Sequence, residues 1–317
     1  MPARHHRPKP PKPTPPVPPV PPVPPTPVPP TGKYLFQDEF TGPAGALVTA
    51  GTSPSSKLWT VRNSGRNNGA YVTDSTSVAH LDGSSQGNLV LSVGKAGTLG
   101  ASAALFPAPI VDTGGGPVSE QIGSDGTAPK FAIRPGMSCE MRLAVNTVTG
   151  TWPAAWFVPV LASGEYPANW SEIDMEESYG TGFADSSIWG TNPALNTSEN
   201  PVNMVNVKML SKLDSGFHVF RLDYQGSGST VTQISMYLDN APAPYSVATP
   251  ATAKAAGCTW NYNGNNGMII QLNVAVFSKT TWQPTPPKAG STPGIILTCD
   301  YVRVWAPAGP DPVAKTT

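Results

Sequence analysis

Charged residues, cysteines and long hydrophobic runs are all scarce in this sequence. Only 13% of the 317 residues are charged, and 20 acidic residues balance 20 Lys and Arg residues. A neutral chain lacks the basic surface with which proteins bind nucleic acids or anionic membranes, so neither is expected as a main partner. No apolar run approaches the roughly 20 residues that a membrane-spanning helix needs, and we expect no membrane span.

The three cysteines are too few for a disulfide framework, and their spacing does not fit a zinc site. Cys139, Cys258 and Cys299 are best interpreted as small buried thiols. The alternative is a disulfide between Cys258 and Cys299 in an oxidising compartment, which would leave Cys139 buried.

A classical signal peptide is also lacking, because residues 1–8 are basic but no apolar segment follows them. Three explanations stay open: export by another route, processing of a longer chain, and delivery outside the cell as part of a virion. We therefore expect an extracellular or virion-associated protein.

Proline, by contrast, is concentrated at one end of the chain. Sixteen of the 38 prolines lie in residues 2–30, where Pro-Pro-Val repeats from Pro15 to Pro25. Such a segment lacks backbone donors and adopts polyproline II, spanning about 70 Å from Pro8 to Pro30 if fully extended. We predict a disordered, basic, proline-rich arm over residues 1–32, which is either a solvated linker or a tether to a larger assembly or cell wall. Residues 33–306 are predicted to form one domain, followed by a short disordered tail over residues 307–317.

Short β-rich segments, separated by Gly, Pro, Asn and Ser, make up the predicted domain. Several alternate polar and apolar residues, and others are continuously apolar, as inner strands are. No long segment has a 3.6-residue period. The pattern predicts an all-β sandwich of two antiparallel sheets, with a concave face on its curved inner sheet. The predicted strands are residues 88–93, 138–145, 217–224, 231–239, 268–276 and 299–305.

One acidic segment stands out in a chain with so few charges. Glu172, Asp174 and Glu176 alternate with Ile173 and Met175. Side chains two apart on a strand share a face, so the acidic residues would form a row while the apolar pair enters the core. Three like charges in a line are electrostatically unfavourable, which indicates a function. The alternative is an exposed edge strand whose acidic alternation is accidental.

The spacing of this row fits the cleavage of glycosides. The Cα atoms of Glu172 and Glu176 would lie about 13 Å apart along a strand. On a concave sheet their side chains would bring the carboxyl groups to about 5–6 Å, the separation found in retaining glycosidases. Asp174 would hydrogen-bond to one or both glutamates and raise the pKa of a neighbouring carboxyl by like-charge repulsion.

Several segments occur in an order typical of one enzyme family. Residues 172–176 are similar to an E-x-D-x-E active-site strand without its extra bulge residue, and residues 150–159 resemble a "WPAFWLLP" segment. On these motifs the chain resembles glycoside hydrolase family 16, the laminarinase and lichenase group, over about residues 34–306. Further similar segments are residues 36–40, 58–60, 87–91, 140–143, 190–191, 217–220, 272–275 and 300–305.

The resemblance implies a concanavalin A-like β-jelly-roll fold and a retaining mechanism that uses no metal and no organic cofactor. It implies that Glu172 is the nucleophile, that Glu176 is the general acid/base, and that Asp174 is their hydrogen-bonding partner. Glu177 is expected to face the opposite side of the strand and is therefore left out of the predicted site.

Polysaccharide binding requires flat apolar platforms for sugar rings and polar groups for hydroxyls. Trp170 lies two residues before Glu172, so it is expected on the same face, beside the nucleophile. Trp152 and Trp156 belong to the "WPAAW" segment and are candidates for the cleft wall.

Asn273 matches an Asn of the family on a neighbouring strand and is expected to bind a hydroxyl group. Asn67 lies in a predicted loop. Its side chain either donates a hydrogen bond to the substrate or only belongs to a plain turn. Weaker platform candidates are Trp189, Trp282 and Tyr262, whereas His218 and Arg303 are expected to be structural.

The sequence therefore predicts an endo-acting retaining β-glycan hydrolase. β-1,3-glucan or mixed β-glucan is the default substrate and galactan stays open, because residues 179–188 and 277–278 depart from the family pattern. One alternative is a non-catalytic glycan-binding module on the same sandwich. The other is an adhesive or structural virion component that meets a host cell-wall glycan.

Overall fold

The computed structural model describes most of the predicted domain in separate stretches. They are residues 34–47, 57–61, 79–94, 108–114, 129–146, 148–160, 171–178, 184–191, 201–208, 213, 216–262, 267–276 and 292–306. The predicted arm and tail, together with Asn67, Trp170 and Trp282, lie outside the described residues. The predicted domain boundaries stay predictions.

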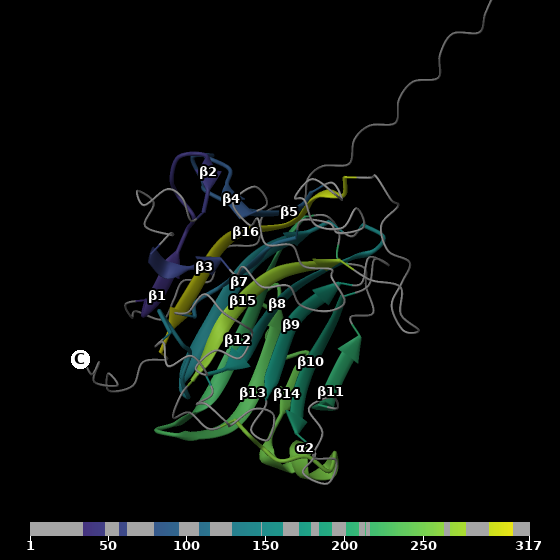
Figure 1. Ribbon diagram of the computed structural model, residues 1–317. Coiled ribbons are helices and arrows are strands. Elements are labelled where there is room, and N and C mark those ends of the chain that lie inside the picture. The colour runs from purple at the N-terminus through teal and green to yellow at the C-terminus, as the bar shows by residue number, and fades with distance from the viewer. Residues whose placement is uncertain are drawn as a thin grey trace, which may run out of the picture.

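Two antiparallel sheets contain all the strands of the described residues. A nine-stranded sheet has the order β14-β13-β12-β7-β16-β5-β4-β2, with β1 also paired to β16, and a seven-stranded sheet has the order β11-β10-β9-β8-β15-β6-β3. Figure 1 shows them as stacked layers with the short helix α2 at one end. The predicted two-sheet sandwich is confirmed.

The bounds of the elements follow the chain from β1 to β16. They are β1 Phe36–Asp38, β2 Gly45–Ala46, β3 Thr60–Val61, β4 Ala79–Leu81, β5 Leu89–Val93, β6 Ile110–Asp112, β7 Met137–Val145, β8 Thr151–Pro159, β9 Glu172–Ser178, β10 Ala184–Thr191, β11 Pro201–Lys208, β12 Phe217–Ser227, β13 Thr230–Leu238, β14 Ser246–Ala248, α2 Pro250–Ala255, β15 Met268–Val276 and β16 Gly294–Trp305.

The core fills the space between the two sheets. Every second side chain of an inner strand enters it, because successive residues of a strand point to opposite faces. Phe157, Ile173 and Leu272 come from the seven-stranded sheet, and Met141 and Phe220 from the nine-stranded sheet, all with at most a trace of exposure. The face of the seven-stranded sheet turned away from this core is called the outer face below.

Strand β15 is buried along its whole length, which explains its continuously apolar sequence. Ile270 and Leu272 belong to the main core. Ile269, between Ile270 and the start of the strand, instead packs with Val158 and Trp156 in a separate small cluster. The outer face is therefore also covered at this point, and side chains there lie in a partly desolvated environment.

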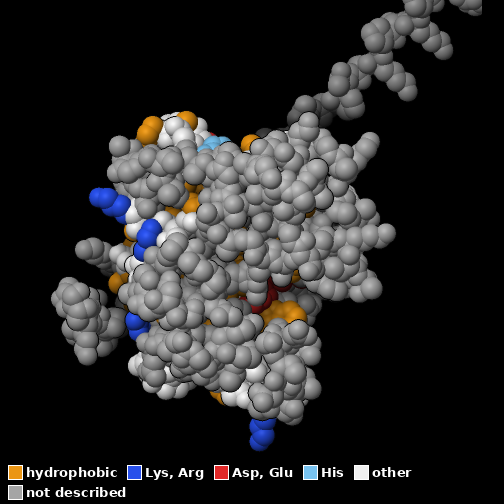
Figure 2. Space-filling view, viewed as in Figure 1, with side chains coloured by type: hydrophobic (Ala, Val, Ile, Leu, Met, Phe, Trp, Pro, Cys, Tyr) orange, Lys and Arg blue, Asp and Glu red, His pale blue; other side chains and the backbone are white. Residues whose placement is uncertain are grey.

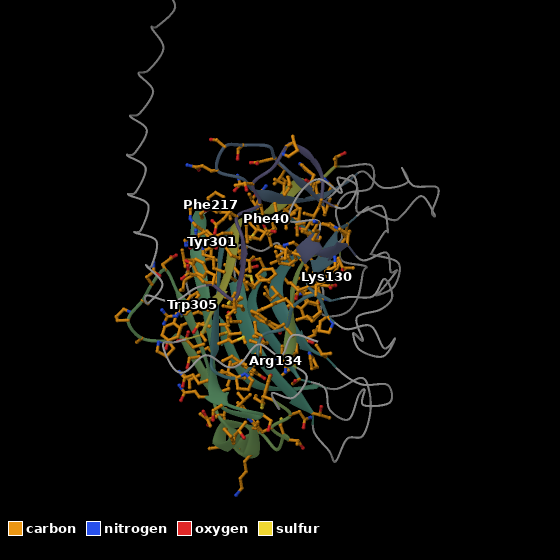
Figure 3. The ribbon with its side chains drawn as sticks, turned by 90° about the vertical axis from the view of Figure 1, so that its left-hand side faces the viewer. Phe40, Lys130, Arg134, Phe217, Tyr301 and Trp305 are labelled. Atoms are coloured by element: carbon orange, nitrogen blue, oxygen red, sulfur yellow. The ribbon has the colours of Figure 1, made fainter. Side chains whose placement is uncertain are left out.

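The nine-stranded sheet carries the residues expected to be structural. Arg303 donates to both carboxylate oxygens of Glu39, at 2.7 and 2.8 Å, and its guanidinium lies 3.8 Å from the ring centre of Tyr301. The Nδ1 atom of His218 lies 2.8 Å from Asp239. Figure 3 shows Phe217, Tyr301 and Trp305 on the side of this sheet. None of these contacts involves a residue of β9.

All three cysteines are free thiols. Cys139 and Cys299 are buried, and burial raises the pKa of both thiols well above its usual range. Cys258 is half-buried next to α2. No helix in the described part of the chain is long and apolar enough to cross a membrane.

Two glycines with similar backbone conformation test how tightly the sandwich is built. Gly267, which precedes β15, has φ +75°, and a Cβ there would lie 2.6 Å from the Ile133 carbonyl oxygen. Gly257, which follows α2, has φ +72° and an open surrounding. Gly257→Ala should cost about 1 kcal/mol for the left-handed backbone alone, and Gly267→Ala about 2 kcal/mol more for the clash. Urea denaturation of the two variants measures the difference, and equal midpoints would contradict this packing.

Candidate active site

Strand β9 lies inside the seven-stranded sheet, between β8 and β10, and it contains one residue too many for both neighbours. Against β8, Asp174 pairs with Trp156 and Glu176 pairs with Ala155, so two steps on β9 match one step on β8. The register with β10 shifts at the same place. Met175 is therefore the extra residue of a β-bulge, and the alternation of side chains is interrupted there.

The registers determine which acidic side chains share the outer face, because directly opposed residues of an antiparallel pair point to the same side. On β10, Asp185, Ser187 and Trp189 alternate along one face. Glu177 lies opposite Asp185, Asp174 opposite Ser187, and Glu172 opposite Trp189. The outer face thus carries Glu172, Asp174 and Glu177.

The expectation of uninterrupted alternation through residues 172–176 is wrong, and so is the expectation that Glu177 faces the side opposite to Glu172 and Asp174. Glu176 lies opposite Ala155, which alternates with the core residue Phe157 and therefore shares its face. The Glu176 side chain is fully buried. Because the bulge inserts one residue after Asp174, Glu177 takes the place on the outer face that simple alternation assigns to Glu176.

Asp174 connects the carboxyl groups of this row. Its Oδ2 atom accepts a hydrogen bond of 2.6 Å from the indole Nε1 of Trp189, and its carboxyl group also hydrogen-bonds to Glu172. Burial raises the pKa of Asp174 well above its usual range, and the charges of Glu177 and Glu172 raise it further. The neutral form of Asp174 is therefore favoured, and in that form the carboxyl group donates to the Glu172 carboxylate.

Tryptophan side chains surround the row and orient it. Trp152 donates from Nε1 to Glu177 Oε1 at 2.9 Å, as Trp189 does to Asp174. Trp156 donates from Nε1 to Asn273 Oδ1 at 2.5 Å. All three indoles are half-buried. An indole that donates to a carboxylate fixes its direction and still presents a ring face for a sugar.

The structure brings most of the predicted site residues together. Trp152 and Trp156 lie on β8, which is next to β9, and Asn273 lies on β15, the strand beyond β8. Trp189, a weaker candidate, lies directly opposite Glu172. Figure 2 shows acidic side chains at the bottom of a hollow on this side of the molecule, with hydrophobic side chains beside them.

Tyr262 has a different place from the one expected for a sugar platform. Its ring is buried in the core, and its hydroxyl group donates to the backbone carbonyls of Glu172 at 2.7 Å and of Trp189 at 2.6 Å. Gly190 allows this segment to come close, because a Cβ there would lie 3.1 Å from the Thr259 carbonyl oxygen. Tyr262 thus anchors the start of β9 from the core side.

Sequence reasoning missed Glu177 and the polar residues of the neighbouring strands. Because Glu176 and Glu177 are adjacent, the sequence fits both the E-x-D-x-E and the E-x-D-x-x-E pattern. The alternation of Asp185, Ser187 and Trp189 was a second pattern from which the outer face could have been predicted. Gln271, opposite Trp156, is also on the outer face and fully buried, and neither of its amide atoms has a hydrogen-bond partner. Among the described residues, no group of three His, Cys, Asp or Glu side chains is arranged to hold a metal ion.

No family model matches the sequence, and no curated protein sequence matches it. Solved structures do match over nearly the whole domain. A protein of Mycobacterium tuberculosis described as an immunostimulatory antigen and pseudo β-1,3-glucanase is 26% identical, with a TM-score of 0.60, over 87% of this chain and 100% of that one.

Two further structures give the same result. An endo-1,3-β-glucanase from Streptomyces sioyaensis is 21% identical, with a TM-score of 0.61, over 89% of this chain and 100% of that one. A glycosyl hydrolase family 16 protein from Mycobacterium smegmatis is 22% identical, with a TM-score of 0.57, over 86% of this chain and 100% of that one. The resemblance to glycoside hydrolase family 16 and the jelly-roll sandwich are thus confirmed at the level of the fold.

The buried Glu176 gives a prediction for stability. Its Oε1 atom accepts a bond of 2.5 Å from the Ser178 hydroxyl, whereas Oε2 has no partner. Burial raises the pKa of Glu176 from 4.5 to about 8, so the native state keeps this carboxyl neutral at pH 7. As the pH rises from 4.5 to 8, the unfolded chain releases the proton first, and native stability falls by up to about 1.4 kcal/mol per pH unit.

Glu176→Gln removes this titration and keeps the side-chain shape. We expect the variant to gain stability over the wild type as the pH rises through that window, and the two to converge at or below its lower end. Urea denaturation of both proteins at several pH values measures the effect. If the free energy of unfolding changed with pH in the same way for both proteins, Glu176 would not be a neutral buried acid.

Proposed function

We propose that this protein is an endo-acting retaining β-glycan hydrolase with Glu172 as the nucleophile and Glu177 as the general acid/base. The observation that carries the proposal is the row of three carboxyl groups on the outer face of β9, bordered by indoles. Two of the matching structures are described as a β-1,3-glucanase and a family 16 hydrolase, which supports a glycan as the substrate class.

The three carboxyl groups have environments that suit different roles. Burial favours the neutral form of Asp174, which hydrogen-bonds to Glu172, and Glu172 is the carboxylate that attacks the anomeric carbon. Glu177 is held by the Trp152 indole on the same face, five residues further along the bulged strand. A carboxyl group there protonates the glycosidic oxygen as it leaves.

The reaction then proceeds in two displacements. Glu172 forms an ester bond to the anomeric carbon while the glycosidic bond breaks, and the leaving oxygen takes the proton of Glu177. In the second step the Glu177 carboxylate removes a proton from water, the water oxygen attacks the anomeric carbon, and the bond to Glu172 breaks. Each displacement inverts the anomeric centre, so the β configuration is retained.

A non-catalytic glycan-binding protein is the second candidate. It is favoured by the 26% identical structure from M. tuberculosis, which is described as a pseudo β-1,3-glucanase. The partly desolvated outer face with its three indoles suits sugar binding with or without cleavage. Location outside the cell or on a virion, and a tether through the proline-rich arm, stay predictions from the sequence.

Substrate incubation separates the two candidates. We expect the protein to cleave laminarin or lichenan internally, so that viscosity falls faster than reducing ends accumulate, and Glu172→Ala serves as the inactive control. Agarose and actinobacterial cell-wall galactan cover the galactan alternative. Binding of one of these polysaccharides without any release of reducing ends would support the glycan-binding protein instead.

Adjacent glutamates provide a matched test of the acid/base assignment. Glu177→Gln should lower kcat on polysaccharide by about 10²–10⁴-fold, the usual contribution of a general acid/base. Glu176→Gln should stay within about threefold of the wild type, because a buried neutral carboxyl and an amide have the same shape. A large loss in Glu176→Gln with Glu177→Gln unaffected would restore the alternating-strand assignment.

Adding azide distinguishes the nucleophile from the general acid/base. The substrate is a β-glycoside with an activated leaving group such as dinitrophenol. Glu172→Ala lacks the nucleophile, so azide attacks the substrate directly and gives the α-glycosyl azide. Glu177→Ala still forms the glycosyl-enzyme, so azide gives the β-glycosyl azide. Product NMR identifies the anomer, and exchanged anomers would reverse the two assignments.

A further inference from the structure

Met175 has no register partner on β8 or β10, and two hydroxyl groups converge on its backbone carbonyl group. Ser186 Oγ donates to the Met175 carbonyl oxygen at 2.7 Å. The Tyr245 hydroxyl lies 3.1 Å from the same oxygen and 3.0 Å from Ser186 Oγ. This triangle is on the core side of the sheet, directly behind the carboxyl row.

The two hydroxyl groups come from different parts of the sandwich. Ser186 lies on β10 at the point where its register with β9 shifts. Tyr245 precedes β14, and its backbone N–H donates to Met236 in the nine-stranded sheet at 2.9 Å. The contact therefore joins the bulge both to the adjacent strand and to the opposite sheet, and the Ser186 side chain is fully buried.

A buried carbonyl group without a donor is strongly unfavourable, so the partners of Met175 select a backbone conformation. In an unbulged strand this carbonyl would be paired in the ladder, and the two hydroxyls would have no carbonyl to bind. In the bulged strand both hydroxyls lie within hydrogen-bond distance of this carbonyl oxygen. The same choice decides whether Glu176 or Glu177 occupies the outer face.

We propose that Ser186 and Tyr245 are positioning residues that hold the Met175 bulge and thereby place Glu177 beside Glu172 and Asp174. This proposal rests on the proposed function in so far as Glu177 acts in catalysis. Tyr262 holds the other end of the strand through the Glu172 carbonyl, so loss of the bulge contacts displaces Glu177 relative to a fixed Glu172.

The test is the double variant Ser186→Ala/Tyr245→Phe, with Tyr224→Phe as its matched control. Tyr224 is a buried core tyrosine whose hydroxyl group has no hydrogen-bond partner among the described residues. Both proteins thus lose a buried phenolic hydroxyl, and only one loses the donors to the bulge. If the double variant does not fold, Tyr245→Phe alone is measured against the same control, with the same changes expected at smaller size.

An activity-independent readout is the indole signal of Trp152, whose Nε1 donates to Glu177. With ¹⁵N-labelled tryptophan, we expect this signal, assigned with Trp152→Phe, to shift or broaden in the double variant and to stay in place in Tyr224→Phe. The signal of Trp189, which donates to Asp174 on the other side of the bulge, should move less.

The kinetic readout is kcat on the polysaccharide that the wild type cleaves. We expect kcat to fall at least about 10-fold with KM changed less than about twofold, because a misplaced acid/base slows the chemical step without removing sugar contacts. Tyr224→Phe should keep the wild-type kcat. The proposal would be overturned if the Trp152 signal and the kcat of the double variant both matched those of Tyr224→Phe. If the wild type cleaves no glycan, the proposed function is refuted. The Trp152 signal then decides the positioning role by itself.

Discussion

The arrangement of the candidate site depends on one extra residue in the ladder of β9. A strand has a side-chain period of two, so a single inserted residue moves every later side chain to the other face. Met175 is that residue, with registers that shift against both β8 and β10. In an unbulged β9, Glu177 would point into the core and Glu176 would face outward. The hydrogen bonds from Ser186 and Tyr245 explain how a buried strand tolerates the interruption.

Protonation resolves the conflict of placing four acidic residues within six positions. Burial raises the pKa of Asp174 well above its usual range and that of Glu176 to about 8, which favours the neutral form of both carboxyl groups. On the outer face, Asp174 then lies between Glu172 and Glu177 as a carboxyl group whose neutral form is favoured. Indoles supply the remaining donors, to Asp174 from Trp189 and to Glu177 from Trp152. Protonation of the buried carboxyl groups thus reduces the repulsion that a row of like charges would have.

Sequence alone predicted the sandwich well, because its strands are set by local pattern. Strand β15 was predicted with the bounds that the structure has. The structure extends β12 to Ser227 and starts β16 at Gly294, where polar or continuously apolar residues gave no alternation to follow. The bulge was beyond reach for a different reason. Residues 172–177 fit two registers equally well, and the choice depends on neighbouring strands and on Tyr245, 70 residues away in the chain.

The central claim is that Glu172 and Glu177, separated by a bulge, face one sugar chain. A crystal structure of Glu172→Gln with a bound β-1,3-gluco-oligosaccharide tests this most directly. The account predicts that the sugar chain crosses the outer face of β9, with the Glu177 carboxyl group within hydrogen-bond distance of a glycosidic oxygen and Glu176 in the core. A structure with Glu176 at the glycosidic oxygen, or with β9 unbulged, would contradict it.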